Sequence, residues 1–68
     1  MDLWDYIYSY VRLKLKTGET FTGDVIAVFG AEEVEEREDS LSLEVRQGQI
    51  YGFFASEIQT ITRLNRNG

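Results

Sequence analysis

The 68-residue sequence contains no cysteine, no histidine and no proline. Without cysteine it cannot form a disulfide framework, and without cysteine or histidine it cannot build the usual thiolate and imidazole zinc site. The lack of cysteine also fits a reducing compartment, so we expect a cytoplasmic location. Catalysis is restricted as well, because a serine, threonine, lysine or tyrosine nucleophile would lack an imidazole base. We therefore expect no enzyme activity, no metal site and no cofactor.

Long apolar runs are also absent. No stretch approaches the roughly 20 apolar residues that span a bilayer. Residues 1–11 carry acids at Asp2 and Asp5 and no basic side chain, so we do not expect a secretory signal. The length suits one domain, residues 1–68. Because so small a domain buries only roughly 60% of the surface that its unfolded chain exposes, its core is thin, and we expect a homo-oligomer.

Negative charge is concentrated in one segment. The chain has a formal net charge of −5 from seven basic and twelve acidic residues. Residues 32–39 account for all of it, because they hold one base, Arg37, and six acids: Glu32, Glu33, Glu35, Glu36, Glu38 and Asp39. Four interpretations of this acidic loop, within residues 30–39, stay open: a solvated loop, a site for a basic protein groove, a nucleic-acid mimic or a cation site. We expect its acids to contribute little to stability.

Strict alternation of apolar and polar residues in residues 11–16 predicts a half-buried strand. The valine and leucines would face a core, and the basic side chains would lie on the other side. We name this second surface the basic face; it consists of Arg12, Lys14 and Lys16. It is an ordinary solvent face with snorkelling side chains, a nucleic-acid surface, or a surface for the acidic loop of the same or a neighbouring subunit.

The remaining pattern predicts a mostly β fold, a small five-stranded antiparallel bent barrel with a short N-terminal helix. The helix is expected over residues 2–10, and the strands over residues 11–17, 20–29, 40–46, 50–55 and 59–64, with one helical turn over residues 56–58. Gly18 and Gly48 mark turns. Gly23 marks a bend inside the second strand. The unbroken apolar run after it, residues 25–29, indicates burial on both sides, or burial on one side and a partner on the other.

Both faces of the fourth predicted strand are apolar. Tyr51 and Phe53 share one face, and Ile50, Gly52 and Phe54 share the other. Because one of these faces can meet another subunit, we predict an oligomer interface at Tyr51 and Phe53.

The stretch V-R-L-K-L-K-T-G-E-T-F-T-G-D-V-I-A-V-F, residues 11–29, resembles the first signature of the Sm and Sm-like (LSm, Hfq-related) proteins. That signature combines alternating apolar residues, a glycine turn, a second glycine five residues on and an apolar run. The resemblance implies a small SH3-like barrel. Members that bind uridine-rich RNA place Asp and Asn after strand two and an Arg-Gly pair between strands four and five. Here Phe29 and Gly30 stand where that Asp is expected, and residues 53–58 read F-F-A-S-E-I, so uridine recognition is not implied.

The layout is also similar to the Rho-modulating proteins of the Rof family, with an acidic-aromatic N-terminal segment, a small barrel and acidic character. Those proteins occupy the RNA-binding surface of a transcription termination factor. We therefore expect a non-catalytic binding or regulatory module that acts through protein contacts, with modulation of a nucleic-acid-binding partner implied by this likeness. The alternatives are an Sm-like RNA-binding protein that uses the basic face, and a structural subunit of a ring.

Overall fold

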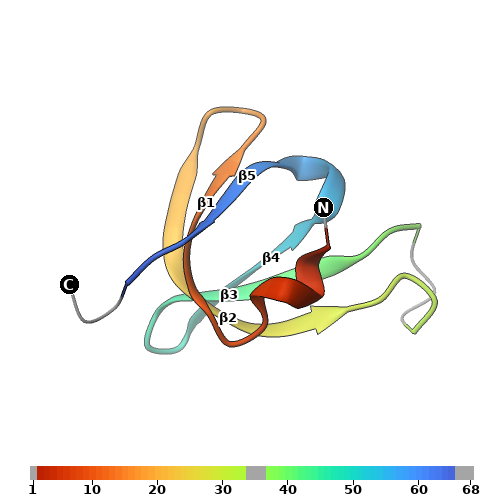
Figure 1. The fold of residues 1–68 in the computed structure, drawn as a ribbon, viewed down its shortest axis with the longest axis horizontal. Coiled ribbons are helices and arrows are strands. Elements are labelled where there is room, and N and C mark those ends of the chain that lie inside the picture. Colours follow the sequence, from red (N-terminus) through yellow and green to blue (C-terminus); the bar gives the residue numbers. More distant parts are fainter. Residues whose placement is uncertain (1, 34–36, 66–68) are drawn as a thin grey trace.

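The computed structural model describes residues 2–33 and 37–65 and shows five antiparallel strands in a single sheet (Figure 1). The strands are β1 (Tyr10–Leu15), β2 (Thr20–Phe29), β3 (Ser40–Arg46), β4 (Gln49–Phe54) and β5 (Ile58–Arg63). Two short 3-10 helices accompany them, η1 (Leu3–Tyr6) and η2 (Ala55–Glu57). The predicted mostly β fold is confirmed, and the limits of the strands lie within one or two residues of those expected.

The sheet is curled but not closed. Its order is β4-β3-β2-β1-β5, so β4 and β5 form the two edges, although only the three residues of η2 separate them in the chain. Because three residues span at most about 10 Å, the end of one edge must lie near the start of the other. No ladder joins β4 to β5 within the described ranges, so the sheet does not close and the expected bent barrel describes it only loosely. The two edges keep unpaired backbone groups.

β2 passes from one half of the sheet to the other at Gly23. It pairs with β1 over residues 20–24 and with β3 over residues 24–29. Gly23 is buried, and a Cβ atom at this position would lie 2.2 Å from the carbonyl oxygen of Glu44. Only glycine allows the backbone of β3 to approach so closely. The structure therefore places Gly23 where the sequence predicted a bend.

The apolar run after Gly23 contains a β-bulge. Val25 pairs with Leu43 and Ala27 pairs with Ser42, which leaves Ile26 without a partner across the ladder. The extra residue lets Val25 and Val28 both reach the core although they are three positions apart. The run therefore covers the core on one side and leaves apolar side chains on the other.

The core lies inside the curl of the sheet and takes residues from every strand. Alternation places the valine and leucines of β1 inward, as expected, and does the same for the leucines of β3. Val45 is only half-buried, because a register shift follows Glu44. The buried apolar residues are Leu3, Val11, Leu13, Leu15, Val25, Val28, Leu41, Leu43, Phe53 and Ile58.

The helix predicted over residues 2–10 is wrong beyond its first turn. Asp2 Oδ1 accepts a hydrogen bond from the Trp4 amide at 3.0 Å, but the 3-10 helix ends at Tyr6. Tyr8 then takes a left-handed φ of 63°, and its amide donates to the Val25 carbonyl at 2.7 Å. Residues 8 and 9 therefore pair with β2 instead of continuing the helix, in line with the strand preference of tyrosine and isoleucine.

Arg63, in the last strand, holds this N-terminal segment against the sheet. Its Nε donates to Ser9 Oγ at 3.2 Å, and its guanidinium also donates to the Asp5 carbonyl. The guanidinium carbon lies 5.2 Å from the centroid of the Tyr6 ring, within the range of a cation–π contact. Side chains from the two ends of the chain thus close one side of the core.

Candidate protein-interaction surfaces

β4 is an edge strand without a charged side chain. Every residue of Gln49–Phe54 is exposed except Phe53, and Ile50 is 53% exposed. Natural edge strands usually carry charge or proline that prevents pairing with other chains. β4 has neither, so its backbone is open to a strand from another molecule.

The two residues of the predicted interface on β4 differ in burial. Phe53 is only 7% exposed, and its ring centroid lies 5.1 Å from that of Phe21. Tyr51 also contacts Phe21, at 5.6 Å, but stays 45% exposed. Phe53 is therefore a core residue, and the expectation that its side chain faces a partner is wrong. Ile50 and Phe54, on the opposite face of the strand, are exposed instead.

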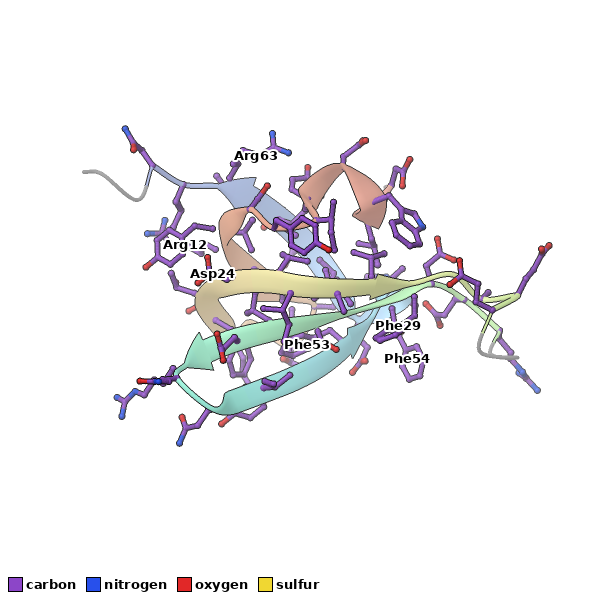
Figure 2. The ribbon with its side chains drawn as sticks, turned by 90° about the horizontal axis from the view of Figure 1, so that it is seen from below. Arg12, Asp24, Phe29, Phe53, Phe54 and Arg63 are labelled. Carbon is purple, nitrogen blue, oxygen red and sulfur yellow. The ribbon has the colours of Figure 1, made fainter. Side chains whose placement is uncertain are left out.

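The outer surface of β2, β3 and β4 is apolar at one end. The pairing register places Ser40 between Phe29 and Phe54, so two aromatic side chains flank a small one. Figure 2 shows both phenylalanines at the end of the sheet where β2 leads into the acidic loop. The next row contains only small residues, Ala27, Ser42 and Gly52. We name this surface the apolar face; it consists of Ile26, Ala27, Phe29, Ser40, Ser42, Gly52 and Phe54.

The acidic loop adjoins this face. Some of its described acids accept hydrogen bonds through their side chains, and the others do not. The Glu38 carboxylate accepts hydrogen bonds from the Ser56 amide at 2.6 Å and from Ser56 Oγ at 2.8 Å. Asp39 Oδ1 accepts from the Ala31 amide at 3.0 Å. These two acids fix the base of the loop to η2 and to the end of β2.

The other predicted acids of the loop are exposed or lie outside the described part of the chain. Glu32 and Glu33 are exposed and follow closely on Phe29 of the apolar face. Glu35 and Glu36 lie outside the described residues. The acids available to a partner at this end are therefore Glu32 and Glu33, rather than all the described acids of the loop.

The basic face lies on the other half of the sheet. Its three residues are exposed, as alternation predicted. Arg12 pairs with Thr22 of β2 and Thr62 of β5, and Lys14 pairs with Thr20 and Thr60 in the same way. Each of these two cations is thus flanked by threonines on both sides. The sequence pattern alone did not reveal this arrangement, because it depends on which strands are neighbours.

In residues 2–33 and 37–65, no three or more acids, histidines or cysteines form a group that could hold a metal ion. The same part of the chain contains no helix long and apolar enough to cross a membrane.

No protein-family model, no curated protein and no solved structure matches this chain. The resemblances to the Sm-like and Rof families therefore stay predictions.

Proposed function

We propose that this chain is a non-catalytic binding module that contacts another protein through the apolar face. The observation that carries the proposal is the row Phe29–Ser40–Phe54, in which two phenylalanines, each 39% exposed, flank a serine. Ile26, at the bulge, adds a third exposed apolar side chain at 36%. Contiguous exposed apolar surface of this kind marks interaction sites in soluble proteins. The adjacent row of small residues lets a partner approach the sheet closely.

Charge indicates the chemistry of the partner. Glu32 and Glu33 lie beside the apolar face, and the segment that they begin holds the whole net charge of the chain. A complementary partner would present apolar side chains next to lysine or arginine. This favours a basic protein, such as one that also binds nucleic acid, because opposite charge accelerates association and disfavours wrong partners.

A second candidate function, a structural subunit of a homo-oligomer or ring, is favoured by the two open edges of the sheet. β4 is uncharged, and β5 carries no charge before Arg63, so neither edge is protected against pairing along most of its length. Pairing through an edge would satisfy the open backbone groups of β4. An RNA-binding function has less support, because the residues that Sm-like proteins use for uridine are absent and the chain is acidic.

A test of the main proposal uses the double variant Phe29→Asn, Phe54→Asn. Proteins are captured from the native lysate by the immobilised wild-type and variant chains, with and without nuclease, which separates protein from RNA partners. We expect the wild type to capture a protein even after nuclease treatment, and we expect the double variant not to capture it. The matched control is Tyr8→Asn, which removes the most exposed aromatic ring, 81%, and leaves Phe29 and Phe54 in place. Equal capture by the double variant would contradict the proposal.

A further inference from the structure

The basic face forms a regular polar surface on the outside of β1, β2 and β5. Residues directly opposite one another on neighbouring strands project to the same side of a sheet. The ladder therefore produces two rows, Thr62–Arg12–Thr22 and Thr60–Lys14–Thr20, with Lys16 beyond the second row. Three cations lie along one strand with hydroxyl groups on both sides of the first two. All these groups can donate hydrogen bonds to an anion.

The cations of this face are not neutralised inside the described part of the molecule. Arg12, Lys14 and Lys16 are exposed, and none of their side chains makes an ion pair or hydrogen bond with another described residue. This differs from Arg63, whose guanidinium is occupied by Ser9, Asp5 and Tyr6. The face is therefore free to bind carboxylates or phosphates.

The acidic loop lies at the other end of the molecule from the basic face, whose own neighbouring acid is Asp24, one row beyond Thr22 on β2 (Figure 2). The described residues form an elongated body with extents of 37 × 22 × 21 Å, and the connection between β2 and β3 projects at one end of the long axis (Figure 1). Figure 2 shows Arg12 toward one end and the segment after Phe29 toward the other. Glu32 and Glu33 are exposed there, and neither carboxylate has a partner among the described residues. The acidic loop of one molecule can thus reach the basic face of a second.

We propose that the basic face binds the acidic loop of a second copy of this chain, through Glu32 and Glu33 of one molecule and Arg12 and Lys14 of the other. The threonines of the two rows donate further hydrogen bonds to the incoming carboxylates. The inference shares Glu32 and Glu33 with the proposed function, but it also requires Arg12 and Lys14, which the proposed function does not use.

Two observations favour a carboxylate-bearing loop over a nucleic acid at this surface. None of the residues in the two rows is aromatic, so these rows offer no platform on which bases could stack, and Tyr10 in the next row is half-buried. The net charge of −5 also repels a polyanion, whereas the loop that holds this charge is attracted to the face.

Charge reversal in two separate variants tests the contact. One variant carries Arg12→Glu and Lys14→Glu, and the other carries Glu32→Lys and Glu33→Lys. Each alone has like charges on loop and face, so we expect self-association about tenfold weaker than in the wild type at low salt. In an equimolar mixture the two variants present opposite charges to each other in both directions. We expect the mixture to recover association to within about threefold of the wild type.

Association is measured by sedimentation of fluorescently labelled protein at about 20 mM salt and again at about 300 mM, where exposed charges are screened. The contact should weaken about tenfold across this range. Circular dichroism checks that both variants fold. If the variant with Arg12→Glu and Lys14→Glu does not fold, the neutral variant Arg12→Gln, Lys14→Gln takes its place. A mixture that associates no more tightly than either variant alone would overturn the proposal. So would a random single-stranded RNA oligonucleotide that binds the wild type more tightly than a second copy does.

Discussion

The carboxylate of Glu38 receives both the backbone amide and the side-chain hydroxyl of Ser56, at 2.6 and 2.8 Å. These bonds tie the base of the acidic loop to η2, which connects the two edges of the sheet. The expectation that all six acids contribute little to stability did not take these two bonds of Glu38 into account. It treated the segment as uniformly solvated, whereas this carboxylate accepts hydrogen bonds from two donors of η2.

Glu38→Ala should lower the free energy of unfolding by about 1 kcal/mol, because it removes two charge-assisted hydrogen bonds. Urea denaturation followed by tryptophan fluorescence measures the change. The matched control is Glu32→Ala, which is exposed and has no partner among the described residues. Equal stability of the two variants would show that the Ser56 contact adds nothing.

Gly23→Ala should destabilise the domain strongly, by at least about 2 kcal/mol, since the new Cβ would meet backbone that cannot move without separating β2 from β3. Gly52→Ala is the matched control. A Cβ at Gly52 would lie 3.9 Å from the nearest atom, the carbonyl oxygen of Leu41, so this variant should keep wild-type stability or gain slightly. Thermal unfolding of both variants distinguishes a steric requirement at Gly23 from the general effect of replacing glycine in a strand.

Tyr8→Gly should raise the free energy of unfolding by roughly 0.5 kcal/mol. Tyr8 holds a left-handed φ of 63°, which non-glycine residues adopt at a cost, and its side chain is 81% exposed and loses little packing. The comparison variant is Tyr8→Ala, which removes the same ring but keeps the backbone cost. If the two melt at the same temperature, the left-handed conformation carries no measurable strain.

The sequence predicted those parts of the fold that depend on alternation along one strand. Val11, Leu13 and Leu15 are buried and the basic residues between them are exposed, because a strand has a period of two wherever it lies. It failed where tertiary pairing decided the outcome. Residues 8 and 9 exchange backbone hydrogen bonds with Val25, and no local pattern in the N-terminal segment announces that partner.

The candidate surfaces were predictable only in part for the same reason. Alternation showed that β4 has two apolar faces, but which one meets the core depends on the curl of the sheet, so Phe53 was assigned outward and Phe54 received no role. The bulge at Ile26 could not be distinguished from a strand buried on both sides. The threonine rows beside Arg12 and Lys14 depend on β5 lying next to β1, although the two strands are far apart in the sequence.

The open edge at β4 makes a separate prediction about oligomerisation. Ile50 is 53% exposed on this uncharged strand, and Ile50→Lys places a charge where a second strand would pair. We expect the wild type to be oligomeric at high micromolar concentration, by light scattering behind a sizing column, and Ile50→Lys to be shifted toward the monomer. The control is Ile26→Lys, which alters the apolar face but not the edge and should leave the oligomer intact. Measurement at about 300 mM salt excludes contacts that depend on exposed charge, so an oligomer that persists there requires apolar or backbone pairing. A monomeric wild type under these conditions, or equal effects of the two lysines, would show that β4 is not the site of assembly.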